Sequence, residues 1–276
     1  HRLTETVGQI ERVRAGVTLA EPGHGAAVVV LGCELVEHGA KGCDQVAVEE
    51  VLVDAELVQV GGLEHFEVVQ AGFAQTTANP PDTVSREEGL GIARVLSDPI
   101  VARSSFLPDI YAGSGVSRRH LVHGRQVILD VLDGTRHSGS PFLPGPDPLG
   151  PTTATRMKMY AESAPPLAVT AVVRALADCG LSAQQITHLV LVSCTGFVAP
   201  GIDEALIRTL GLHPDVQRVQ VGYMGCHGAI NGLRTSLAFA SDPAAVVLMV
   251  AVELCSLHYY YGMSADKVVA NALFAD

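Results

Sequence analysis

Three apolar runs in the second half of the chain have the length of strands and are rich in valine, leucine and isoleucine. They cover residues 186–192, 216–221 and 244–252. Runs of this length and composition are typical of strands whose two faces are both covered by other parts of the protein. The pattern therefore predicts three buried strands.

Two helices are predicted around the first of these strands. Residues 167–179 and 202–210 have helical apolar spacing and are followed by Gly180 and Gly211. Glycine directly after the last helical turn is a common stop signal, because it adopts a left-handed conformation without steric cost. In the first helix, four apolar residues are predicted to share one buried face: Val169, Val172, Val173 and Leu176.

A third helix is predicted to begin around Cys226 and to end near residues 241–243. Glycines at positions 222, 225 and 228 permit a tight turn between the preceding strand and this helix. Three apolar residues recur at helical spacing and are predicted to define its packed face: Ile230, Leu233 and Leu237.

Strands and helices alternate through this region in the order of a βαβαβ unit. Right-handed crossovers place such strands in one largely parallel sheet, with their carboxyl ends at the same rim. Three segments are therefore expected to meet at that rim: residues 193–196, Cys226 and residues 253–255.

Cys226 is the candidate nucleophile at the predicted rim. A thiol in the first turn of a helix lies in the positive field of the helix dipole, which favours the thiolate over the thiol. The alternative is a small buried apolar residue, which is the role of most cysteines outside disulfides. The local sequence alone leaves both interpretations open.

Several sequence motifs along the chain resemble those of a known family, and this resemblance favours the interpretation of Cys226 as a nucleophile. They resemble the type III polyketide synthases, the chalcone-synthase-like enzymes of the thiolase superfamily, and among them the bacterial branch. The resemblance runs from about Gly72 to Asp276, and its ordered strings are residues 77–81, 114–120, 151–156, 193–201, 221–229, 251–256 and 271–276.

The resemblance implies an α/β, thiolase-like fold. In this family two similar halves stack into five αβαβα layers, and the matched region corresponds to the first βαβαβ half. We therefore expect residues 71–276 to form the N-terminal half of a type III polyketide synthase, truncated before the histidine and asparagine that the family carries in its second half. Residues 1–70 form an unmatched acidic segment with a net charge of −8, against −3 for the remainder.

The implied chemistry is decarboxylative Claisen condensation. An acyl-CoA starter would load onto Cys226 as a thioester, and malonyl-CoA would lose carbon dioxide to give the attacking enolate. CoA thioesters would be substrates, so no bound cofactor is expected. Family members are homodimers, and the interface is expected beside the loop of residues 197–201.

The family also implies roles for residues around the nucleophile. His258 matches a residue that lines the acyl cavity, and Phe274 matches the aromatic gatekeeper between the CoA tunnel and that cavity. Glu253 matches a buried glutamate, for which a structural hydrogen-bonding role is expected because a buried carboxylate must be paired. The remaining matched cavity-wall positions are Cys194, Thr195, Ala199 and Cys255.

Two features that the reaction would use, a base next to the nucleophile and a basic site for the CoA phosphates, are not found where they would be expected. His227 is adjacent to Cys226, but neighbouring helical residues point about 100° apart, so it is not expected to serve as the base. The segment 106–113, where plant relatives place basic residues around the CoA phosphates, offers Asp109 and no lysine. Arg118 and Arg119 are nearby alternatives for a phosphate site.

Composition limits the partners. A net charge of −11 argues against nucleic acid as a partner, and no apolar run is long enough to span a bilayer. With no leader pattern at the first residues, a cytoplasmic protein with reduced cysteines is expected. No metal site is expected, because the spacing of Cys33 and Cys43 with His24 and His38 fits no standard zinc pattern.

Two alternative functions stay open from the sequence. A ketoacyl-carrier-protein synthase of the same superfamily would share the cysteine and the βαβ order, but would need a basic surface for its acidic carrier. The other alternative is a catalytically incomplete remnant that keeps the fold of one half without the complete machinery.

Overall fold

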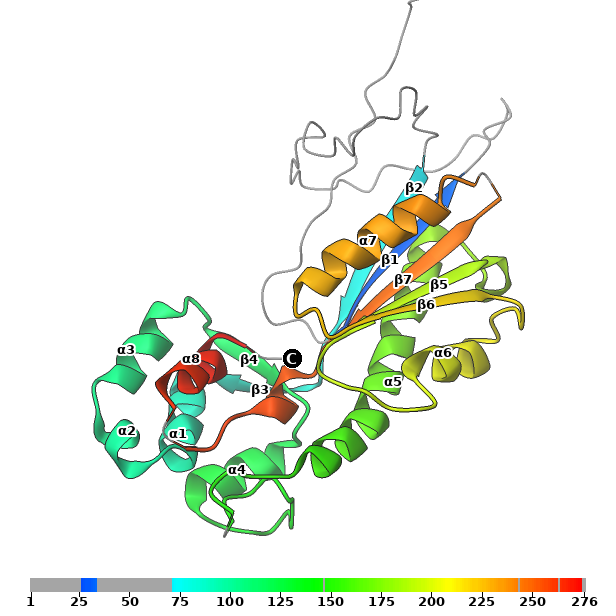
Figure 1. The fold of residues 1–276 in the computed structure, drawn as a ribbon. Coiled ribbons are helices and arrows are strands. Elements are labelled where there is room, and N and C mark those ends of the chain that lie inside the picture. Colours follow the sequence, from blue (N-terminus) through cyan, green and yellow to red (C-terminus); the bar gives the residue numbers. More distant parts are fainter. Residues whose placement is uncertain (1–25, 34–70, 146, 243, 263, 275–276) are drawn as a thin grey trace, which may run out of the picture.

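The computed structural model describes residues 26–33 and 71–274, except residues 146, 243 and 263. The described chain forms two bodies (Figure 1). The larger body is a five-stranded sheet covered by helices on both faces, and the smaller body packs short helices around a two-stranded sheet. The last helix, α8, belongs to the smaller body although it follows the sheet in sequence (Figure 1).

The sheet of the larger body has the strand order β2-β1-β7-β5-β6. β5 pairs in parallel with both β6 and β7, whereas β1 pairs antiparallel with β7 and β2. The strands are β1 (Ala26–Cys33), β2 (Ala71–Ala78), β5 (His188–Ser193), β6 (Gln217–Gly222) and β7 (Val246–Val252).

The three predicted strands are confirmed as β5, β6 and β7, and their parallel pairing is the one that a βαβαβ unit requires. The two antiparallel strands at the other side of the sheet were not foreseen. Residues 28–31 lie in β1, where Val28 pairs with Val250. The domain boundary at residue 70 stays a prediction, with β1 contributed from its N-terminal side.

Helices α5 (Thr153–Cys179) and α6 (Ile202–Leu210) cover one face of the sheet (Figure 1). α6 has the predicted bounds and ends at Gly211, whose φ is 65°. α5 ends as predicted at Gly180 but begins well before residue 167, because its path continues through Pro165 and Pro166. Among the described residues, no helix is long and apolar enough to cross a membrane.

The predicted buried face of α5 is wrong at one position. Val172 and Leu176 are buried, but Val173 is 51% exposed. Four small residues take the closest positions against the sheet and the core instead, because alanine lets the helix backbone approach its neighbours. They are Ala164, Ala168, Ala171 and Ala175.

Helix α7 (His227–Phe239) covers the opposite face of the sheet (Figure 1). Its packed face also differs from the prediction, since Ile230 and Leu237 are exposed, although Leu233 packs against the core. The buried stripe is Gly228, Gly232 and Ser236. A side-chain carbon at Gly232 would lie 2.6 Å from Cγ2 of Val192, so only glycine permits this close approach of α7 to β5.

The smaller body is built around its own apolar core. Buried residues from both strands, two helices and the C-terminal segment pack there, among them Val84, Ile92, Ile128 and Tyr261. Its elements are β3 (Asp82–Ser85), α1 (Arg86–Leu96), α2 (Pro99–Arg103), α3 (Phe106–Gly113), β4 (Arg118–Leu121), α4 (Arg125–Asp133) and α8 (Ala265–Leu273). Two 3-10 turns complete the described elements: η2 (Ala183–Gln185) and η3 (Cys255–His258).

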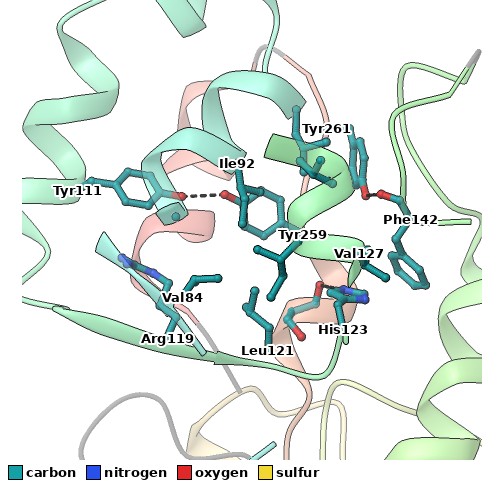
Figure 2. Close-up of a pocket in the computed structure, with 15 residues that line it drawn as sticks. Val84, Ile92, Tyr111, Arg119, Leu121, His123, Val127, Phe142, Tyr259 and Tyr261 are labelled. Atoms are coloured by element: carbon teal, nitrogen blue, oxygen red, sulfur yellow. Dashed lines mark hydrogen bonds between the residues drawn. The ribbon is translucent and has the colours of Figure 1, made fainter. Parts of the chain in front are cut away.

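A cavity of about 40 Å³ lies within the smaller body (Figure 2). Its wall is mostly apolar, and the hydroxyl groups of Tyr111 and Tyr259 are hydrogen-bonded at 2.7 Å beside it. The Arg119 guanidinium lies over the ring of Tyr111, at 4.7 Å from the ring centre, and donates to the carbonyl oxygen of Ala272. Arg119 therefore joins β4 to the last turn of α8.

The buried imidazole of His123 makes the stability of this body depend on pH. Burial lowers the pKa of His123 from 6.5 to about 4, because a charged ring is disfavoured there, although a hydrogen bond to the Ser256 carbonyl opposes the shift. A folded pKa below the unfolded value means that this contribution is complete above pH 6.5 and is lost as pH falls towards 4.

We therefore expect wild type to lose about 3 kcal/mol of unfolding free energy over this interval through His123 alone. His123→Phe, which keeps a ring against Phe142, should remove that part of the slope. Urea unfolding of both proteins at pH 7.5, 5.5 and 4.5 measures the difference. Parallel pH profiles for the two proteins would contradict the assignment.

Candidate active site

A cavity of about 270 Å³ opens at the carboxyl ends of β5, β6 and β7, between the two bodies. The predicted convergence of three chain segments at this rim is confirmed, since residues 194–195, Cys226 and Glu253 all line the cavity. The smaller body supplies the opposite wall through η3 and α8. The complete lining is Cys194, Thr195, Gly225, Cys226, Glu253, Cys255, His258, Tyr259, Ala270, Asn271 and Phe274.

The turn that presents Cys226 contains two left-handed residues. Tyr223 has a φ of 61° and Gly225 a φ of 59°. Glycine adopts this conformation freely, whereas a residue with a side chain pays on the order of 1 kcal/mol. The turn is therefore strained at Tyr223, and strain of this kind is often found beside functional groups.

Cys226 is the N-cap residue of α7 and is exposed. The predicted helix therefore begins at the expected position, and the thiol lies at the helix end where the dipole favours an anion. The amide of Gly228 donates to the Gly225 carbonyl at 2.9 Å, which closes the first turn. Exposure, cavity and helix start together favour a nucleophile over a buried apolar residue.

Glu253 holds the segment that follows β5. Its carboxylate accepts hydrogen bonds from the backbone amides of Cys194 at 2.8 Å and Thr195 at 2.9 Å, and from the Thr195 hydroxyl. Burial raises the pKa of Glu253, and these hydrogen bonds partly oppose the rise. The carboxylate thus has the pairing that a buried acid needs, as its predicted structural role requires.

His258 and Phe274 both reach the cavity, as the resemblance implies. The Nε2 atom of His258 lies 2.6 Å from the Thr195 carbonyl oxygen, so the tautomer protonated at Nε2 donates to it. Asn271 was not predicted as a site residue, although it begins one of the recognised strings. Its side chain accepts from the amide of Tyr260 and donates to the carbonyl of the same residue, both at 2.9 Å.

Ala199 does not lie where the prediction places it. It is exposed in the loop between β5 and α6, before a cis peptide bond to Pro200, and is not part of the cavity lining. The loop leaves the rim towards α6, so only its first residues, Cys194 and Thr195, face the cavity. The correspondence in sequence therefore does not make Ala199 a wall residue within this chain.

The expectations for the base and for the CoA phosphate site have different outcomes. His227 is exposed and outside the cavity lining, in agreement with its rejection as the base. Arg119 is only 3% exposed and is engaged with Ala272, so it cannot offer a surface site for CoA phosphates, whereas Arg118 is exposed. No group of three or more potential metal ligands occurs among the described residues, which exclude Cys43, His24 and His38.

Comparison with known proteins shows which family the chain resembles. Residues 147–276 match the family described as chalcone and stilbene synthases, N-terminal domain. The chain is also 34% identical over 224 residues to the alpha-pyrone synthesis polyketide synthase-like protein Pks18 of Mycobacterium tuberculosis. The chain resembles the chalcone and stilbene synthase family. That alignment covers 75% of this chain and 53% of Pks18.

Solved structures of type III polyketide synthases share the fold of this chalcone-synthase-like chain. PKS-I of the brown alga Ectocarpus siliculosus superposes with a TM-score of 0.62 at 31% identity, covering 72% of this chain and 52% of that structure. Tetrahydroxynaphthalene synthase of Streptomyces coelicolor, a bacterial type III polyketide synthase, superposes with a TM-score of 0.58 at 27% identity, over the same shares of the two chains. The thiolase-like α/β fold is therefore confirmed.

The chain spans about half the length of the type III polyketide synthases that it matches. A plant relative, bisdemethoxycurcumin synthase of Oryza sativa, shows the same proportion, with 33% identity over 75% of this chain and 50% of the relative. The matched proteins belong to a family of acyltransferases.

We expect Cys226 to be the most reactive thiol of this chain. Burial raises the pKa of Cys179, and the Cys194 sulfur is hydrogen-bonded, whereas Cys226 is exposed at a helix start. Brief labelling with iodoacetamide near pH 6.5, followed by peptide mapping, should modify Cys226 first. Preferential modification of Cys194 or Cys255 would contradict this expectation.

Proposed function

We propose that the chain provides the nucleophile and the acyl cavity of a type III polyketide synthase, which condenses an acyl-CoA starter with malonyl-CoA through a cysteine thioester. One observation carries the proposal: Cys226 begins α7 and opens into a cavity that contains five of the six other residues expected to contact substrate. Acyl-CoA and malonyl-CoA are the proposed substrates, and a homodimer is the proposed assembly.

The first step is acyl transfer to Cys226. The thiolate attacks the thioester carbonyl of the starter, a new carbon–sulfur bond forms, and CoA leaves as its thiolate. The positive end of α7 favours the attacking thiolate and the negative charge that develops on the carbonyl oxygen. Support for CoA thioesters as substrates comes from the crystal structure of CsyB in complex with CoA. That structure superposes on this chain with a TM-score of 0.52 at 26% identity.

The second step is decarboxylative condensation. Malonyl-CoA loses carbon dioxide, and the resulting enolate carbon attacks the thioester on Cys226, which releases the cysteine sulfur. An enolate needs hydrogen-bond donors, but the Asn271 amide is engaged by Tyr260 and His258 donates to Thr195. We therefore assign this step to the histidine and asparagine that the family carries in its second half.

Incubation of the 276-residue chain with a medium-chain acyl-CoA tests the proposal. Intact mass should increase by one acyl group, and peptide mapping should place it on Cys226 as a thioester that hydroxylamine removes. Subsequent malonyl-CoA should give little extension, because the Asn271 amide and the His258 ring are already hydrogen-bonded to backbone groups. Acylation at another residue, or none with any acyl-CoA, would refute the assignment of the nucleophile.

A further inference from the structure

The strained turn before Cys226 needs a contact that holds it. Two of its residues, Tyr223 and Gly225, are left-handed, and Cys226 follows directly. The Tyr223 side chain is 83% exposed, and its ring centre lies 6.4 Å from that of Phe197 on the neighbouring loop. Packing of Tyr223 therefore contributes little to the conformation of the turn.

The Cys194 sulfur makes that contact. It accepts a hydrogen bond from the backbone amide of Met224 at 3.3 Å and donates its own hydrogen to the carbonyl oxygen of Gly225 at 3.4 Å. The sulfur thus bonds to the two residues between the strained Tyr223 and the nucleophile. Sulfur hydrogen bonds are individually weak, but a donor and an acceptor on one atom fix the turn in two directions.

Cys194 is itself held in place by the sheet. It follows directly after β5, and its backbone amide donates to Glu253, which lies directly after β7. The path from the sheet to the nucleophile therefore runs through Glu253, the backbone of Cys194, its sulfur and the turn. The Cys194 side chain connects two adjacent strand ends.

We propose that Cys194 is a positioning residue that holds the β6–α7 turn and thereby orients the Cys226 thiol for attack. The inference rests on the proposed function only where it speaks of attack on a substrate, since the contacts of Cys194 are present without any substrate. It assigns Cys194 a role beyond that of a wall residue of the acyl cavity.

Alkylation of Cys226 by iodoacetamide separates the two roles of Cys194. The reagent is too small to need the acyl cavity, so a simple wall residue would not affect the rate at which the Cys226 sulfur displaces iodide. We expect Cys194→Ala to lower the rate constant for Cys226 about tenfold, which corresponds to the loss of one or two weak hydrogen bonds. The melting temperature should stay close to that of wild type, because the contact lies at an exposed turn.

Cys194→Ser is the matched rescue variant. A hydroxyl both donates and accepts but prefers shorter contacts than sulfur, so it should restore the rate to within about threefold of wild type. Cys179→Ala, which removes a thiol at the distant end of α5, controls for the loss of one reactive group and should alkylate at the wild-type rate.

Two results would overturn the proposal: an unchanged Cys226 rate in Cys194→Ala, or a Cys194→Ser protein as slow as Cys194→Ala. The same preparations, incubated with acyl-CoA, test the proposed function separately. If wild type forms no acyl-enzyme, that function fails, while the alkylation rates still decide whether Cys194 positions the nucleophile.

Discussion

Cys226→Ala is expected to reduce acyl-enzyme formation from acyl-CoA by at least about a thousandfold, to the background of the other thiols. The cavity and the start of α7 would remain, but no side chain there could form a thioester. Intact-mass spectrometry over a time course gives the rate. Because an exposed N-cap residue is replaced by a small one, the fold should be retained, which circular dichroism and thermal melting verify.

Two further variants make this expectation specific. Cys226→Ser keeps a hydroxyl at the helix start and should acylate far more slowly than wild type, because a serine hydroxyl is a much weaker nucleophile than a cysteine thiolate. Cys179→Ala should acylate like wild type, since that thiol lies at the end of α5. Wild-type rates in Cys226→Ala would show that another residue carries the acyl group.

Among the substitutions considered, Gly196→Ala is expected to cause the largest loss of unfolding free energy. A side-chain carbon at Gly196 would lie 2.1 Å from a ring carbon of Tyr160, which is buried and hydrogen-bonded through its hydroxyl to Ser193 at 2.6 Å. Neither the ring nor the backbone can move without breaking buried contacts. We expect a loss of about 3 kcal/mol and a melting temperature lower by roughly 6–12 °C.

The matched control for this substitution is Gly113→Ala. A side-chain carbon there has no neighbour within 4 Å, and Gly113 is the last residue of α3. Its stability should change by less than about 1 kcal/mol. Equal melting temperatures for the two variants would mean that the Tyr160 ring can be displaced at little cost.

Much of the larger body could be predicted because its signals are local. The bounds of α6 follow from apolar spacing and from Gly211, and β5, β6 and β7 lie within two residues of the apolar runs. The position of Cys226 at a helix start follows from the change from a strand-like apolar run to helical apolar spacing. Two of the cavity's residues, His258 and Phe274, could be assigned only through the resemblance, because no local pattern places them at the rim.

The errors concern contacts that depend on tertiary packing. The face of α7 was assigned to Ile230 and Leu237, since apolar spacing gives no weight to glycine, yet close backbone approach to β5 selects Gly228 and Gly232. Helix α5 continues through two prolines, although proline favours a helix that starts only after it. Ala199 lies outside the cavity because the loop changes direction after Thr195, and no local signal marks that change.

The division of the cavity between two bodies has an evolutionary consequence. Under the proposed function, selection can reshape the space for the growing chain by substitutions in η3 and α8, while the cysteine and its turn remain anchored to the sheet on the other side. The shape of the cavity and the reactivity of the cysteine are then inherited through separate parts of the sequence. A protein built this way can acquire new products without first having to recover a lost nucleophile.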